Sequence, residues 1–220
     1  MSSATSKLAR IEDGKRSYPQ SLDAVPPSDR IAVIDIGSNS ARLVIYGKNG
    51  RYPTPLFDER SNCQLGARLD QTGHLVQDRI DATLETITRF AAIIRAMQVT
   101  ACYPIATAAV RRAKNGADFY RPAEDILGMP IQILSQQDEA NYVSRGLTLN
   151  IPDADGLVAD LGGGSIEIVL LDKGVATHGI SHNFGHLSDV DEADVLKAFQ
   201  NTDWLAACKA KRLYLSLIHI

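Results

Sequence analysis

The chain lacks several features that define whole classes of protein. It has only three cysteines, Cys63, Cys102 and Cys208, which show no C-x-x-C spacing, and no secretory apolar segment opens the sequence. An odd and scattered set of thiols argues against a disulfide framework and for a reducing cytoplasm. No apolar run approaches the roughly 20 residues that a membrane-spanning helix needs. The sequence therefore predicts a cytoplasmic protein without a membrane partner.

An excess of positive charge is also missing. The chain has 23 Lys and Arg against 26 Asp and Glu, a formal net charge of -3 over 220 residues. Non-specific nucleic-acid binding usually needs a broad basic field, so no nucleic-acid partner is expected. Any polyanionic ligand must be held by local donors. A hydrophobic content of 45% is ordinary for a globular protein that buries a real core. Residues 1–30 have no apolar period and predict a flexible leader.

Two glycine-rich turns dominate what is present. Each follows an apolar run that ends in an aspartate: IAVIDIGSNSARLVIY begins at Ile31 and GLVADLGGGSIEIVLL begins at Gly156. Each pattern predicts a strand, a tight turn and a second, antiparallel strand. The GSNS segment taken alone is also typical of an ordinary hairpin turn. Two matching patterns are much harder to obtain from turn chemistry, so we interpret them as two related cradles that face one ligand.

The chemistry of these turns favours phosphate. Backbone N–H groups of a glycine-rich turn converge on an anion, and Ser38, Ser40 and Ser165 add hydroxyl donors. Asp35 and Asp160 cannot hold a phosphate themselves, because like charges repel. Their expected task is to hold Mg²⁺ or to orient a water molecule.

The remaining pattern alternates strands with helices. Apolar spacing predicts helices over residues 76–97, 117–127 and 192–199, and another that follows Ser135 and carries Glu139 in its first turn. A strand is expected to end near Ala106, with Thr107 as the N-cap of a following helix that carries Arg111 and Arg112. A strand is expected over 173–180. Antiparallel hairpins within this alternation predict an α/β fold with a mixed sheet.

Four segments together resemble a known family: DIGSNSARLVIY, ATAAVRRAKNGADF, SQQDEA and VADLGGGSIEIV. Their order and spacing are similar to those of the exopolyphosphatase and guanosine pentaphosphate phosphatase (Ppx/GppA) family, within the actin-like ATPase superfamily. The resemblance covers residues 31–180. It implies a ribonuclease H-like unit with a mixed five-stranded sheet, duplicated around a cleft in which Mg²⁺-assisted hydrolysis releases terminal phosphate. Residues 31–150 would form the first unit and residues 151–215 the start of the second.

The resemblance also assigns roles. Glu139 falls at the position of the catalytic base, with Asp138 as the adjacent alternative, although neighbours on a helix point in different directions. Asp160 and Glu167 fall at acidic positions implicated in Mg²⁺ binding, and Asp35 is the third candidate metal ligand. The candidate phosphate-binding residues are Gly37, Ser38, Asn39, Ser40, Thr107, Arg111, Gly162, Gly163, Gly164 and Ser165.

Other polar residues carry weaker hypotheses. Arg42 is expected either to meet a phosphate or nucleotide or to be a plain surface residue, and Arg112 is expected to be solvated. His178, His182 and His186 are four residues apart, but they span a strand, a glycine and a loop, so a zinc site is disfavoured.

The end of the chain departs from the family. Members continue further, and some form dimers, whereas SLIHI closes this sequence without another glycine loop. We expect a truncated chain in which residues 216–220 are foreign to the fold, with a homodimer as an option only for the full-length protein. The predicted substrate is inorganic polyphosphate or guanosine pentaphosphate, with polyphosphate preferred. The alternatives are an ATP-dependent phosphotransferase and a non-catalytic module that binds a guanosine nucleotide.

Overall fold

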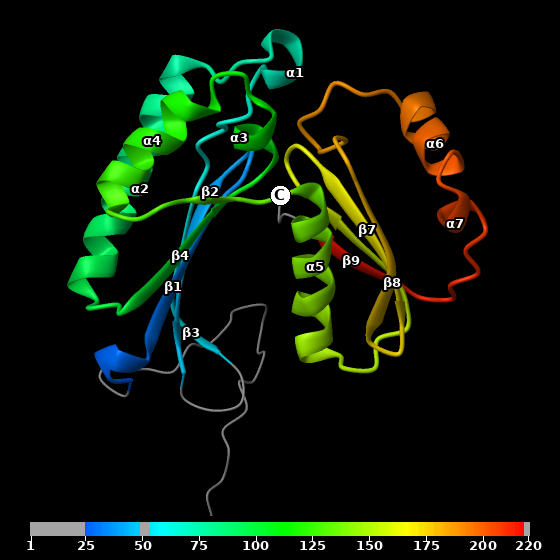
Figure 1. The fold of residues 1–220 in the computed structure, drawn as a ribbon, viewed down its shortest axis with the longest axis horizontal. Coiled ribbons are helices and arrows are strands. Elements are labelled where there is room, and N and C mark those ends of the chain that lie inside the picture. The colour runs from blue at the N-terminus through cyan, green and yellow to red at the C-terminus, as the bar shows by residue number, and fades with distance from the viewer. Residues whose placement is uncertain (1–24, 49–52, 218–220) are drawn as a thin grey trace, which may run out of the picture.

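The computed structural model describes residues 25–48 and 53–217, which form two β-sheets that stand side by side (Figure 1). Most of the expected leader therefore lies outside the described residues. Of its last residues, Val25 is buried and a 3-10 turn spans Pro27–Asp29. Among the described residues, none of the helices combines the length and apolarity that crossing a bilayer requires.

The first sheet is mixed, as predicted. Its strands are β1 (Arg30–Ile36), β2 (Ala41–Gly47), β3 (Thr54–Ser61), β4 (Ala101–Ala106) and β5 (Gln132–Ile133), in the spatial order β3-β2-β1-β4-β5. The three strands β1, β2 and β3 form an antiparallel meander, and β4 and β5 run parallel to β1. The parallel pairings require crossovers through helices, which is why helical patterns separate these strands in the sequence.

Two long helices, α2 (Gln77–Ala96) and α4 (Gly116–Leu127), cover the outer face of this sheet (Figure 1). Two short helices, α1 (Leu69–Thr72) and α3 (Ala108–Arg112), lie near its upper end in that view. In β1 the side chains of Ala32, Ile34 and Ile36 are fully buried, in one cluster with Phe90 of α2 and Phe119 of α4. Because side chains alternate along a strand, Asp35 points to the opposite face, toward the second sheet.

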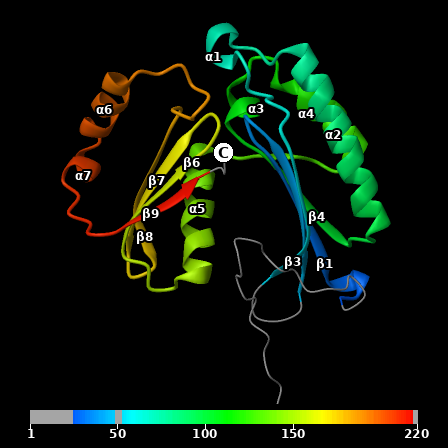
Figure 2. The same cartoon turned by 180° about the vertical axis from the view of Figure 1, so that it is seen from behind.

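The second sheet repeats this plan with β6 (Gly156–Leu161), β7 (Ile166–Asp172), β8 (Val175–His182) and β9 (Leu213–Leu217), in the order β8-β7-β6-β9. Again a meander of three antiparallel strands is flanked by a strand parallel to the first. Helix α5 (Gln136–Asn150) lies on the face toward the first sheet, and α6 (Glu192–Gln200) and α7 (Asp203–Ala206) lie beyond the other face (Figure 2).

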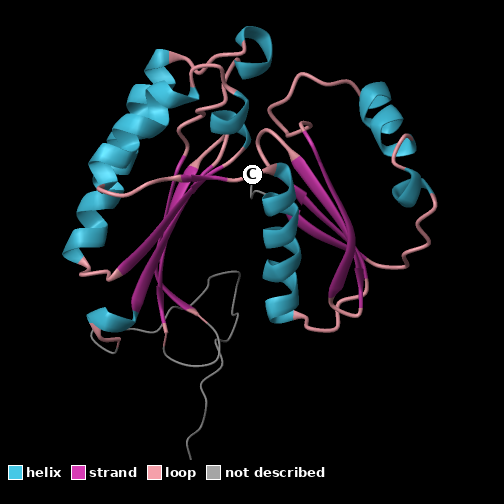
Figure 3. Ribbon diagram, in the orientation of Figure 1, coloured by secondary structure: helices cyan, strands magenta, loops and turns pink. Residues whose placement is uncertain are grey.

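The duplication makes Asp35 and Asp160 equivalent. Each is the penultimate residue of the first strand of its meander, and each pairs with the second residue of the returning strand, Arg42 and Glu167 respectively. The alternation of helices and strands in Figure 3 is that of the ribonuclease H-like, actin-like ATPase fold, with five strands in the first unit and four described in the second.

Two boundaries differ from those expected. Helix α5 was expected to belong to the first unit, but it packs against β7 and β8 of the second sheet. The boundary between the two units therefore lies at Ser135, where this helix begins, and not after residue 150. Ser216 and Leu217, expected to be foreign to the fold, pair with Asp160 and Leu161 as part of β9. Strand pairing uses backbone groups, so an apolar extended segment beside β6 continues the sheet without a glycine loop. Residues 218–220 lie outside the described part.

Candidate active site

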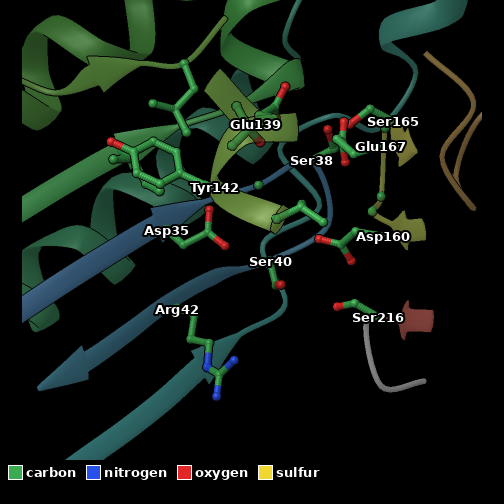
Figure 4. A pocket seen from close by; sticks show the side chains of 18 of the residues that line it. Asp35, Ser38, Ser40, Arg42, Glu139, Tyr142, Asp160, Ser165, Glu167 and Ser216 are labelled. Carbon is green, nitrogen blue, oxygen red and sulfur yellow. The ribbon is translucent and has the colours of Figure 1, made fainter. Parts of the chain in front are cut away.

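A cavity of about 700 Å³ lies between the two units, at the strand ends where the glycine turns are found (Figure 4). Most of the residues assigned from sequence line it: Asp35, Gly37, Ser38, Ser40, Thr107, Glu139, Asp160, Gly162, Gly163, Gly164, Ser165 and Glu167. They come from both units. The tertiary structure therefore brings the two glycine turns, the three candidate metal ligands and the candidate base to one place.

The two glycine turns touch each other. Each is closed by one backbone bond, from Gly37 N to Ser40 O (3.0 Å) and from Gly162 N to Ser165 O (2.8 Å). A Cβ at Gly163 would lie 2.9 Å from the amide nitrogen of Asn39, too close for a real side chain. Glycine is needed in the second turn because the backbone of the first turn passes directly against it.

Asp35 and Asp160 form the acidic part of the cavity. Burial, and then the charge of Asp160, raises the pKa of Asp35 from 3.8 to about 6, against the lowering effect of Arg42 and Arg60. Water still reaches the Asp35 side chain through the open cavity, although both units surround it. Burial also raises the pKa of Asp160, and a hydrogen bond from Ser216 opposes that rise.

Glu139 is held in the first turn of α5. The helix begins at a capping box in which the Ser135 hydroxyl accepts from the amide of Asp138, and the Asp138 carboxylate accepts from the amide of Ser135. Asp138 is thus occupied at the helix end, with a lowered pKa because of its bonds to Ser135. Glu139 turns inward and is only 8% exposed. Sequence neighbours therefore have separate tasks.

The protonation of Glu139 is set by burial and charge. Its pKa is raised from 4.5 to about 7, first by burial and then by the charge of Glu167. Arg111 opposes the rise, since its Nη1 donates to Oε2 of Glu139 at 2.6 Å. A carboxylate with a pKa near 7 is well matched to accepting a proton at neutral pH.

Glu167 is a buried carboxylate on β7. The residue is 5% exposed, and its carboxylate accepts a hydrogen bond from the Ser181 hydroxyl at 2.8 Å. Burial raises its pKa, whereas the hydrogen bonds from Ser181 and Ser165 lower it. Glu167 lies close enough to Glu139 for its negative charge to help raise the pKa of Glu139.

The acidic donors fit a hard cation. Among residues 25–48 and 53–217 no three His, Cys, Asp or Glu side chains form a ready-made ligand cluster. Mg²⁺ usually takes one or two protein carboxylates and completes its octahedron with water and substrate phosphates. Asp35 and Asp160 offer carboxylate oxygens in the cavity, and although Arg42 and Arg60 partly offset the negative charge, the repulsion between the two aspartates would be relieved by a bound cation. Their chemistry thus fits Mg²⁺ with substrate completing the site.

Three of the candidate phosphate-binding residues, Thr107, Arg111 and Asn39, have surroundings that a simple phosphate-binding turn does not predict. Thr107 is the N-cap residue of α3, but its side chain makes no capping bond. Arg111 is absent from the cavity lining; besides Glu139, its Nη1 donates to the carbonyl oxygen of Leu134 at 2.7 Å. The backbone carbonyl of Asn39 accepts a hydrogen bond from the amide of Gln64. Of these three residues, Arg111 is the one that contacts the candidate base directly.

Arg112 and Arg42 both have acidic partners. Arg112, expected to be solvated, forms a partly exposed ion pair with Asp70 of α1. Arg42, for which a ligand contact and a plain surface position were both expected, lines the cavity, has a side chain that is 44% exposed, and donates two hydrogen bonds to Asp58, of 2.8 and 2.6 Å. The planar guanidinium suits such paired bonds to a carboxylate.

The histidines have structural surroundings. His178 stacks on Trp204, and His182 stacks on Phe184. His186 places Nδ1 3.1 Å from the carbonyl oxygen of Gly162.

Sequence reasoning missed several residues that line the cavity. Tyr142 and Val143 follow Glu139 by three and four positions on α5, so helical spacing was the signal that they share its face. Arg60 lies opposite Arg42 in the β2–β3 register, which a sequence without strand pairing does not reveal. Ser216 is placed by the parallel pairing of β9 with β6.

Comparison with solved structures places the fold. The chain aligns with an exopolyphosphatase from Cytophaga hutchinsonii at a TM-score of 0.72 and 24% identity, over 84% of this chain and 66% of that one. It aligns with the PPX-GPPA enzyme of Aquifex aeolicus at a TM-score of 0.68 and 26% identity, over 84% and 67%. The chain thus spans about two thirds of the length of these proteins.

The sequence itself matches a family description. The match is to the Ppx/GppA phosphatase family and covers residues 43–188, which run from within β2 to beyond β8 and include the candidate base and the second glycine turn. This is well over half of the 220 residues. The chain belongs to the Ppx/GppA phosphatase family.

Proposed function

We propose that the site hydrolyses phosphoanhydride bonds and releases terminal orthophosphate from inorganic polyphosphate or guanosine pentaphosphate. The observation that carries this proposal is the position of Glu139. This buried carboxylate has a pKa near 7, is fixed by Arg111, and lines the same cavity as both glycine turns. Such a group can take a proton from a water molecule that attacks a bound phosphorus atom.

The other residues would act on the substrate. The amides of the two glycine turns, with Ser38, Ser40 and Ser165, would hold the oxygens of the terminal phosphate. Thr107 lies beside them in the cavity. Asp35, Asp160 and Glu167 would hold Mg²⁺, which neutralises charge on the phosphate oxygens when it is bound. Glu139 would orient the attacking water and accept its proton.

Polyphosphate is the preferred substrate. Arg42, which is ion-paired with Asp58, and Arg60, which donates to Ser40, extend the polar lining of the cavity beyond the glycine turns, so a longer chain of phosphates would meet polar groups at successive positions. Guanosine pentaphosphate presents the same terminal phosphoanhydride. Both substrates are therefore tested together.

The test is orthophosphate release from long-chain polyphosphate and from guanosine pentaphosphate with Mg²⁺, using the 220-residue chain and its Glu139→Gln variant. We expect release by the wild type, loss of about three orders of magnitude or more in E139Q, and retained substrate binding by calorimetry. D138N is the matched control, because Asp138 caps the helix and should leave turnover nearly unchanged. Normal turnover by a folded E139Q would refute the assignment.

A parallel incubation with ATP and a sugar acceptor tests the phosphotransferase alternative. Transfer of the terminal phosphoryl group to the sugar, in place of orthophosphate release, would favour the phosphotransferase hypothesis. Binding of a guanosine nucleotide without any release would favour a binding module.

A further inference from the structure

The segment 183–188, which we call the backing loop, packs against the second glycine turn from the side opposite the first turn. A Cβ on Gly185 would lie 2.2 Å from both the carbonyl carbon and the oxygen of Gly163, and 2.3 Å from the nitrogen of Gly164. These neighbours are backbone atoms, which cannot swing aside as a flexible side chain can. Gly185 is therefore the residue that allows the two loops to touch.

Two hydrogen bonds fix the orientation of the second turn. The amide of His186 donates to the carbonyl of Gly162 at 3.1 Å, and the amide of Leu187 donates to the carbonyl of Gly163 at 3.0 Å. In a trans peptide the N–H points opposite to the C=O of the same plane. Holding both carbonyls on the backing loop thus directs the N–H groups of Gly163 and Gly164 the other way, toward the first unit and the cavity that they line.

The backing loop is itself closed by Ser188. Its hydroxyl accepts from the amide of Gly185 at 2.9 Å and donates to the carbonyl of Asn183 at 3.3 Å. Ser188 therefore sets the shape of the loop without touching the cavity lining.

The first unit contains a similar arrangement, shifted by one position along the turn. The amide of Gly66 donates to the carbonyl of Ser38 at 2.8 Å, and the amide of Gln64 donates to the carbonyl of Asn39 at 2.7 Å. This segment follows β3 as the backing loop follows β8. In both units, the segment that follows the third strand of the meander thus anchors two successive carbonyls of the glycine turn.

We propose that Gly185 and Ser188 are positioning residues that orient the second glycine turn for phosphate binding. The proposal rests on the proposed function for the identity of the ligand. Gly185 and Ser188 need not contact the substrate, because they act by orienting the peptide groups Gly162–Gly163 and Gly163–Gly164.

The experiment measures the affinity for inorganic tripolyphosphate with Mg²⁺, by calorimetry, in wild type, G185A, S188A, S188T and G146A. We expect about tenfold or greater weakening in G185A and about threefold in S188A, since small displacements of a binding group carry large penalties. S188T should restore affinity because it keeps the hydroxyl. G146A is the matched control, as a Cβ there meets no atom within 4 Å.

A second readout does not depend on the ligand. Hydrogen exchange at the amides of His186 and Leu187 should be faster in G185A and S188A than in wild type and S188T. If G185A fails to fold, the comparison of affinity and exchange between S188A and S188T tests the proposal. Wild-type affinity and exchange in folded G185A or S188A would overturn the proposal. If wild type does not bind tripolyphosphate, the proposed function fails, and the exchange rates alone decide the positioning role.

Discussion

Arg111 and Glu139 come from different units, yet Nη1 of Arg111 lies 2.6 Å from Oε2 of Glu139. Arg111 ends α3 beside the first sheet, and Glu139 begins α5, which packs on the second. The pair is largely shielded from solvent, with side chains 20% and 9% exposed. A residue that the family resemblance assigned to phosphate binding thus stabilises the charged form of the candidate base across the cleft, against the larger opposing effects of burial and Glu167.

Replacing Arg111 should alter the protonation of Glu139. Because the arginine lowers the pKa of the carboxylate, R111Q should raise it and shift the acid limb of the kcat/KM profile upward by about 1 pH unit or more. R112Q is the matched control, since Arg112 pairs with Asp70. An unshifted limb in R111Q, with only a higher KM, would instead favour a phosphate-binding role. The measurement is orthophosphate release between pH 5 and 9.

The wild-type rate should itself decline as pH falls through about 7. Glu139 must be ionised to accept a proton, and its pKa is about 7. The kcat/KM profile reports groups of the free enzyme and is the quantity to measure. An acid limb near the ordinary glutamate value of 4.5 would contradict the role of burial.

Asp35 should make stability depend on pH. Its folded pKa of about 6 exceeds the ordinary 3.8, so the folded chain binds this proton more tightly than the unfolded chain does. The contribution of Asp35 to stability is therefore present below pH 3.8 and declines as pH rises to about 6. We expect D35N to match wild type in Tm near pH 3.5 and to exceed it above pH 6. A constant Tm difference across this range would count against the raised pKa.

Magnesium should bind more tightly as pH rises through about 6. Ionised Asp35 attracts a cation, and Asp160 adds a second oxygen donor. Calorimetry with Mg²⁺ alone should show proton release at pH 6 and an affinity about tenfold or more lower in D160N. D153N, on an exposed residue before β6, is the control. Equal Mg²⁺ affinity in D160N and wild type would remove Asp160 from the metal site.

Alanine at Gly163 should separate the two glycine turns. The added Cβ would lie 2.9 Å from Asn39 N and should displace the second turn. We therefore expect kcat/KM of G163A to fall about tenfold or more. G128A is the control, because Gly128 has a positive φ of 70° but open space around it. It should cost about 1 kcal/mol of stability without weakening turnover. Unchanged kcat/KM in G163A would show that close approach of the turns is dispensable.

Local patterns in the sequence determined much of this protein. Strand, glycine turn and returning strand were readable at Asp35 and Asp160 because alternation and turn chemistry act between near neighbours. The helix that carries Glu139 was readable for the same reason, and so was its start at Ser135. The family resemblance added the mixed five-stranded sheet, which the structure confirms.

Only the tertiary structure determined which residues from different segments contact one another. Arg111 meets Glu139, Arg42 meets Asp58, and Gly185 meets Gly163 across separations of 28, 16 and 22 residues in the chain. Such contacts depend on sheet order and on the packing of α5 against the second sheet, which no local period encodes. The raised pKa values have the same origin, because burial and cross-cleft charge exist only once both units have come together.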